Sequence, residues 1–115
     1  MIDTLITALK TILSKVYLQG ALNPDEGYPD EFITYWTSYT EDGSHYDNSV
    51  NSINWSFQVI VYTNDRSNLI PYAQEITQTL RKIDFIPDGW GAEIASDLDG
   101  WTGWAMDFKK TEYLA

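Results

Sequence analysis

The stretch that decides the fold is INWSFQVIVYT, residues 53–63. One parity of this stretch is apolar throughout: Ile53, Trp55, Phe57, Val59 and Val61. A period of two is typical of a β-strand with one buried face. The other parity begins polar, at Asn54, Ser56 and Gln58, and then becomes apolar. We therefore expect the central strand of a sheet, solvated on one side over its first half and covered on both sides over its second.

Amphipathic helices are predicted before and after this strand. The first, residues 4–18, has apolar residues at spacings of three and four: Ile2, Leu5, Ile6, Leu9, Ile12, Leu13, Val16 and Tyr17. Asp3 is its expected N-cap, and Gly20 is expected to end it. The second, residues 69–83, repeats the pattern at Leu69, Tyr72, Ala73, Ile76, Leu80 and Ile83. Asn68 is its expected N-cap.

Three further strands are expected. Residues 32–39, FITYWTSY, are rich in aromatic and β-branched residues. One side of this strand would carry Ile33, Tyr35, Thr37 and Tyr39. Neither side of the strand is cleanly polar. Residues 92–97 and 101–109 are predicted to form a closing hairpin.

The register of the closing hairpin has two possible solutions. A two-residue turn at Asp99 and Gly100 pairs Ala95 with Trp104. A three-residue loop, residues 98–100, pairs Ile94 with Trp104 and Ala92 with Met106, and it places Gly100 at a left-handed bulge position. Because register follows the buried face, we favour the second solution. It directs three apolar side chains into the core: Trp104, Met106 and Phe108.

Polar connections hold the residues that could suggest chemistry. Residues 21–31 carry four acids without the interleaved spacing of a calcium loop, so a solvated loop is favoured. Ser44, His45 and Asp47 adjoin one another on the long loop 40–52, whereas a catalytic triad is assembled from separate parts of a fold. Turn chemistry accounts for the Asp97 to Gly100 segment. Trp90, between two glycines, is expected to plug the core.

Composition bounds the class of protein. The 115 residues fit one domain, residues 1–115, and 43% hydrophobic content is enough for a core. Absence of cysteine and a single histidine argue against disulfides and structural zinc. A net charge of −10 opposes binding of duplex nucleic acid. The N-terminus lacks the pattern of a signal peptide, and no apolar run is long enough to span a membrane, so we expect synthesis in the cytoplasm and no membrane partner.

Together the elements predict an α+β two-layer sandwich. Two helices pack on one face of an approximately four-stranded, mostly antiparallel sheet. The other face would retain polar residues and a surplus of exposed aromatics, and an exposed aromatic patch usually marks an interface.

The order and pattern of these segments resemble the tail terminators, also called tail completion or tail-to-head joining proteins, of long-tailed phages. The resemblance rests on DTLITALKTIL, EFITYWTSY, WSFQVIVYTNDRSNLIPYAQEITQTLRKI and DGWTGWAMDFKKTEY, and it covers nearly the whole chain. It implies a homohexameric ring in the virion that caps the tail tube and joins it to the neck of the head. It implies no enzyme activity and no cofactor. The tryptophans at positions 90, 101 and 104 exceed the family pattern.

The resemblance implies partners and surfaces: further copies of the chain, the tail tube protein and the head–neck connector protein. DNA would pass through the lumen without specific binding, because an acidic lining repels it. Candidate lumen or loop residues are Glu41, Asp42, His45 and Asp47. Candidate interface residues are Tyr28, Tyr35, Tyr39 and Trp101.

Three alternatives stay open from sequence. The chain could be a head–tail connector or the tail tube protein of the same assembly. It could instead be an unrelated α+β module that binds a small ligand on its aromatic face. An enzyme is the remaining alternative, and no glycine-rich phosphate loop, metal cluster or dispersed His/Cys pair supports it.

Overall fold

Strand β5, Ser52–Thr63, lies at the centre of the sheet. A computed structural model describes residues 1–22, 27–43, 45–46, 49–96 and 100–114. In it β5 pairs antiparallel with β2, Glu31–Asp42, on one side and with β8, Thr102–Tyr113, on the other. The predicted parity is confirmed, since Phe57, Val59 and Val61 are fully buried.

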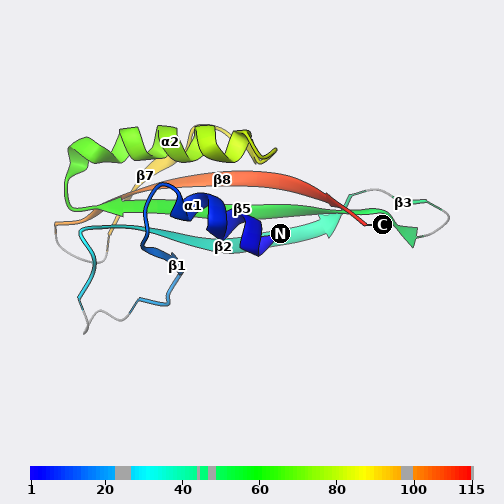
Figure 1. Ribbon diagram of the computed structural model, residues 1–115, viewed down its shortest axis with the longest axis horizontal. Helices are drawn as coiled ribbons and strands as arrows, with labels where there is room; N and C mark the ends of the chain where they lie inside the picture. Colours follow the sequence, from blue (N-terminus) through cyan, green and yellow to red (C-terminus); the bar gives the residue numbers. More distant parts are fainter. Residues whose placement is uncertain (23–26, 44, 47–48, 97–99, 115) are drawn as a thin grey trace.

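The remaining elements complete two layers (Figure 1). They are α1 Ile2–Lys10, β1 Val16–Leu18, β3 His45–Tyr46, β4 Ser49–Val50, η2 Arg66–Asn68, α2 Leu69–Arg81, β6 Ile86–Pro87 and β7 Ala92–Ala95. The main sheet has six strands in the order β1-β2-β5-β8-β6, with β7 also on β8. The α+β class with two helices is confirmed. The expected four strands are corrected to six, because β1 and β6 add two short strands that were not predicted. The sheet is mixed, since β1 runs parallel to β2 and the other pairs are antiparallel.

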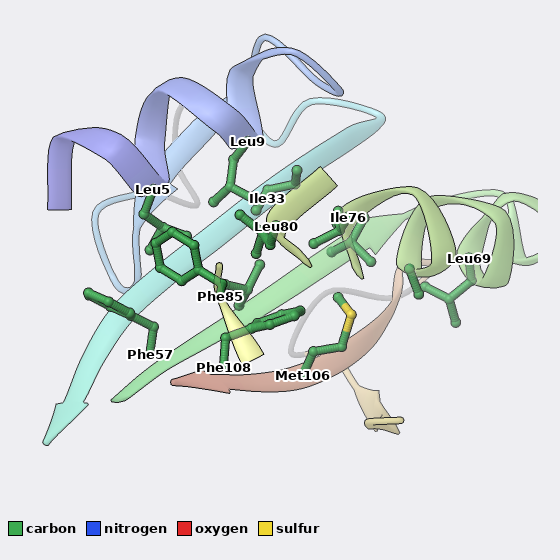
Figure 2. Close-up of a cluster of buried hydrophobic side chains, with 13 residues drawn as sticks. Leu5, Leu9, Ile33, Phe57, Leu69, Ile76, Leu80, Phe85, Met106 and Phe108 are labelled. Atoms are coloured by element: carbon green, nitrogen blue, oxygen red, sulfur yellow. The ribbon is translucent and has the colours of Figure 1, made fainter. Parts of the chain in front are cut away.

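Both helices bury their apolar stripes on the same face of the sheet (Figure 2). From α1 come Leu5 and Leu9, and from α2 come Leu69, Ala73, Ile76 and Leu80. The sheet contributes Ile33, Phe57, Val59, Val61, Met106 and Phe108, and Phe85 follows α2. Phe57 and Phe85 have ring centroids 6.0 Å apart, so the segment after α2 closes the core over the middle of the sheet.

The first helix is shorter than predicted. It ends at Lys10, and Val16–Leu18 forms β1 instead of a final helical turn. Backbone hydrogen bonds fix this strand, since Ile33 N donates to Lys15 O and Gln19 N donates to Tyr35 O. Val16 and Tyr17 favour extended structure, because β-branched and aromatic residues are enriched in strands. The neighbouring edge of β2 supplies the backbone hydrogen-bond partners that such a strand requires. Asp3 makes no side-chain cap, because the N-cap position falls at Met1, and Gly20 lies well beyond the helix end.

A β-bulge in β2 overturns the predicted side-chain parity of that strand. Thr37 pairs with Phe57, but Tyr39 pairs with Ser56, so one extra residue is inserted at position 38. A bulge of this kind reverses the alternation beyond it. Tyr35 therefore packs toward the helices, whereas Tyr39 lies on the opposite face.

The closing hairpin has a register that differs by one residue from the favoured prediction. Glu93 pairs with Trp104 and Ala92 with Ala105. This register turns Glu93 to the helix side of the sheet, where Arg66 Nη2 lies 2.8 Å from its Oε2. The core positions of Met106 and Phe108 are confirmed, with Trp104 half-buried against them, and Gly100 has the expected positive φ of 90°. Residues 98 and 99 of the predicted loop lie outside the described residues.

The second helix agrees with its prediction to within two residues. Asn68 directly precedes α2, but its side chain donates to Glu31 Oε2 at 3.2 Å and does not cap the helix. The short η2 turn begins the helical segment instead. Asp65 caps η2 through Ser67 N at 3.0 Å.

We predict that Phe57→Ala lowers the free energy of unfolding by about 3–5 kcal/mol, because it removes a fully buried ring from the centre of the core. Denaturant unfolding followed by circular dichroism measures the change. Thr7→Ala, on the exposed face of α1, is the control and changes the free energy by less than about 0.5 kcal/mol. A loss below about 1 kcal/mol for Phe57→Ala contradicts the assignment of the core face.

Candidate assembly surface

The sheet is longer than the helices that cover it. Strands of 12 residues span roughly 40 Å, whereas the 13 residues of α2 span about 20 Å. The three long strands therefore continue beyond the helices (Figure 1). We call this projection the arm and define it as residues 39–42, 52–56 and 109–113. The arm accounts for the elongated shape of the molecule, 54 × 28 × 22 Å.

The two outer strands of the arm have open edges. Strand β1 pairs with β2 only at residues 33–35, and β6 pairs with β8 only at residues 108–109. Over the described parts of the chain, no strand pairs with the outer side of residues 36–41 or 110–113. An exposed edge carries backbone donors and acceptors that can pair with another chain.

The sheet face opposite the helices has an aromatic end and a polar end. At the aromatic end Phe32 stacks on Tyr62, with ring centroids 4.9 Å apart, and meets Tyr17 and Tyr28 edge-on. Toward the arm, Trp36 Nε1 donates to Gln58 Oε1 at 2.8 Å. Tyr39 is 48% exposed there, beside Ser56. Polar and aromatic residues share this face as predicted, and Trp36 and Tyr39 are exposed. The expected solvation of the first half of β5 is wrong at Ser56, which is 5% exposed, and Phe32 is also buried.

The four candidate interface residues do not form one surface. Tyr28 contacts Phe32, and Trp101 Nε1 donates to Pro29 O at 3.0 Å, so both belong to the aromatic end. Tyr35 packs against the main core. Only Tyr39 lies on the arm, on the open face. The sequence could not separate these residues, because the bulge at position 38 gives no signal in their periodicity.

The candidate lumen residues lie at or beyond the outer end of β2. Glu41 and Asp42 are exposed strand residues, and not members of a loop as predicted. His45 begins β3, which pairs with β4 at the tip of the arm. Asp47 and Ser44 lie outside the described residues, so the Ser44, His45 and Asp47 grouping stays a sequence observation.

A cavity of about 230 Å³ opens at the aromatic end. Its walls include Tyr28, Phe32, Tyr62 and Gln19. At its base lies Thr34, 5% exposed, whose hydroxyl has no hydrogen-bond partner among the described residues. A buried hydroxyl in an aromatic-walled cavity can bind a small ligand, which is the chemistry that the binding-module alternative requires.

Trp90 is not a core plug as predicted, because it is 82% exposed. Its carbonyl oxygen accepts a hydrogen bond from Trp104 Nε1 at 3.0 Å. The Trp90 side chain borders a groove along α2 with Ile70, Thr77 and Trp104. The two flanking glycines have positive φ, 81° for Gly89 and 89° for Gly91, and this backbone carries the indole outward.

Glu31 and the Arg66–Glu93 pair join separate elements of the fold. Glu31 accepts from Tyr72 Oη at 3.1 Å and from Thr63 Oγ1 at 3.3 Å, joining β2, β5 and α2. Burial, with the Glu31 hydrogen bond second, raises the pKa of Tyr72. Arg66 forms a bidentate pair with Glu93: Nε donates to Oε1 at 2.9 Å and Nη2 donates to Oε2 at 2.8 Å. That hydrogen bonding lowers the pKa of Glu93 and raises the pKa of Arg66.

Comparisons with known proteins give no identity for this chain. No protein-family model matches it, and no curated protein sequence matches it. Within the described residues, no group of three or more His, Cys, Asp or Glu side chains is placed to hold a metal ion. Among the described residues, no helix has the length and apolar character needed to cross a membrane.

We predict that Arg66→Gln raises the pKa of Glu93 toward its ordinary value, because the bidentate hydrogen bond is lost. Since this pKa is lowered by folding, Glu93 stabilises the fold above its unfolded pKa and loses that contribution as pH falls through the folded pKa. Carboxyl NMR titration measures it. Lys82→Gln is the control, because it removes an equal charge at the far end of α2. If the pKa of Glu93 is the same in both variants, the Arg66–Glu93 salt bridge is contradicted.

Proposed function

We propose that this protein is a ring-forming structural subunit of a phage virion, a tail terminator that caps the tail tube and joins the tail to the head. The observation that carries the proposal is the arm, a three-stranded extension of the sheet with two open edges that the helices leave uncovered. Identical subunits joined head to tail form a closed ring when the rotation between neighbours divides a full turn. The resemblance in sequence pattern supplies the place of that ring in the virion, and its partners: the tube protein and the neck connector.

The charge of the molecule suits a channel for DNA. The formal net charge is −10, and Glu41 and Asp42 are exposed on the arm. An acidic wall repels the phosphate backbone, so DNA slides through without being held. In the proposed ring the arms line the lumen, and the protein acts as a structural component, without a chemical step or a cofactor.

Two other functions differ in what they require. A connector or a tube protein would use the same ring contacts, and only a tube protein would stack rings into long polymers. A small-ligand module is favoured by one observation, the unpartnered Thr34 hydroxyl at the base of the aromatic cavity. A monomer whose melting temperature rises with ligand would support that module.

The proposal predicts the effect of reversing charge on the arm. Changing Glu41, Asp42 and Asp47 together to Lys leaves the fold intact, because the two described positions are exposed strand-end residues. It impairs production of infectious particles, since a basic lumen retains DNA. Complementation of a phage that lacks the gene measures the titre. The control changes Glu41, Asp42 and Asp47 to Gln, Asn and Asn, which removes the acids without adding positive charge and should retain more activity.

A normal titre from the triple lysine variant contradicts the lumen assignment. The deletion phage without complementation should accumulate separate heads and tails by electron microscopy. Intact joined particles from the deletion phage contradict the proposed function itself.

A further inference from the structure

We propose that the subunits of the ring join through their sheet edges, with the outer edge of β8 in one copy pairing parallel to the outer edge of β2 in the next, at the level where Thr111 lies beside Glu41. The inference rests on the proposed ring function and names the contact that closes it. The occupant of each edge is a second copy of this chain.

The direction of the backbone groups on β2 follows from printed neighbours. Gly43 N donates inward to Ser52 O. Successive residues of an antiparallel strand alternate between facing the partner and facing away. Counting back from Gly43, Thr40 therefore directs its N–H and C=O outward, away from β5. Tyr35 O, which accepts from Gln19 N on the outer side, gives the same orientation to Thr37.

The same reasoning orients β8. Leu114 N donates inward to Asn51 O, so Tyr113 and Thr111 face outward. Asp107 O independently accepts from Asp88 N on the outer side of β8, in phase with this alternation. Each edge of the arm thus presents outward backbone groups, at Thr40 on β2 and at Thr111 and Tyr113 on β8, and Thr37 faces outward on β2 just before the arm.

The two edges complement each other in direction and phase. Strands β2 and β8 are both antiparallel to β5, so they run the same way and a laterally placed copy meets its neighbour in parallel. In a parallel pair, an outward residue of one strand lies opposite an inward residue of the other and bonds to the residues that flank it. Thr111 and Glu41 satisfy this condition, because both pair with Asn54 and therefore lie at one level.

The side chains agree with this register. Glu41 and Thr111 both pair with Asn54, so they lie on the same face, the one opposite the helices. Parallel pairing would continue that face from copy to copy without inverting it. Tyr113, 82% exposed in the single chain, would then lie against the arm of the next copy.

The β2 edge lacks two of the residues that commonly block such pairing, whereas the β8 edge carries Lys109 and Lys110. Residues 36–41, WTSYTE, contain no proline and no lysine, and a protein that must stay monomeric commonly places one of these on a long edge. Charge also favours unlike edges over like ones. Two β2 edges would bring Glu41 close to another acidic end, whereas β8 offers Lys109, whose side chain is 51% exposed although its Nζ lies 3.8 Å from Asp88 Oδ2 of the same chain.

The sheet is wider in the body of the molecule than in the arm. Copies joined through their arms would therefore form a curved row. At the level of β1 the sheet is five strands wide, in the order β1-β2-β5-β8-β7, and it narrows to three strands in the arm beyond β6. When arms join edge to edge, β1 of one copy and β6 and β7 of its neighbour must lie side by side, so the bodies spread apart. Copies related in this way fan around an axis, and a heterologous contact of this kind closes when the rotation divides a full turn.

Cysteine cross-linking tests the contact, and the chain has no cysteine of its own. Within one chain residues 41 and 111 are separated by β5, about 10 Å, too far for a disulfide. A mixture of Glu41→Cys and Thr111→Cys chains should form a covalent dimer under mild oxidation, and the double variant should form a ladder up to the full ring. Thr7→Cys mixed with Thr111→Cys is the matched control and should remain uncross-linked.

A backbone variant provides a second measurement. Thr111→Pro removes an outward N–H without removing a backbone hydrogen bond to β5, so the chain should keep its circular dichroism spectrum and lose its rings. It also removes the side-chain bond from Thr111 Oγ1 to Asn54 Oδ1, at 2.7 Å, and Thr111→Val removes the same bond. Thr111→Val retains the N–H and should retain the rings.

The outcomes separate the contact from the function. Rings of the unaltered protein in negative-stain images, together with no Glu41→Cys/Thr111→Cys dimer, overturn the edge contact and leave the ring function standing. Dimers from Glu41→Cys alone indicate that two β2 edges meet, which also overturns the head-to-tail contact. A chain that forms no rings under any condition overturns both.

Discussion

The pairing of β5 on both sides is the constraint on which the rest of the structure depends. The apolar side chains on one face of β5 must be buried. Strands β2 and β8 pair with β5 along almost all of its 12 residues. The helices are shorter and cover one half of one face. Packing therefore stabilises the body, and the arm is left as ordered strand structure without a helical layer. Its edges are open because β1 and β6 pair with β2 and β8 over only residues 33–35 and 108–109.

Sequence periodicity predicted an element correctly where its pattern fitted only one type of secondary structure. The parity of β5 and the three-and-four spacing of α2 predicted the central strand and the second helix, because each pattern extends over many residues. The stripe of the first helix failed beyond Lys10. Val16 and Tyr17 continue the helical spacing, but they also suit a strand, and only the neighbouring edge of β2 decides between the two.

The surface was less predictable than the core, for identifiable reasons. A single inserted residue at position 38 moves Tyr39 to the opposite face from Tyr35, and no local pattern announces it. The hairpin register moved by one residue, and in the observed register Glu93 reaches Arg66, a partner 27 positions away in the chain. A register predicted from the burial of apolar residues does not take such long-range polar contacts into account. The same limits explain why Tyr28 and Trp101 turned out to contact their own chain.

The central claim of this account is that the chain exists as closed rings of identical copies. Light scattering over a wide range of concentrations, paired with negative-stain imaging, measures the mass and the shape of the assembly. The account predicts a single mass that is a whole-number multiple of 13.2 kDa, approached as concentration rises, with rings of uniform diameter. A mass of 13.2 kDa at every concentration, with no rings in the images, would contradict it.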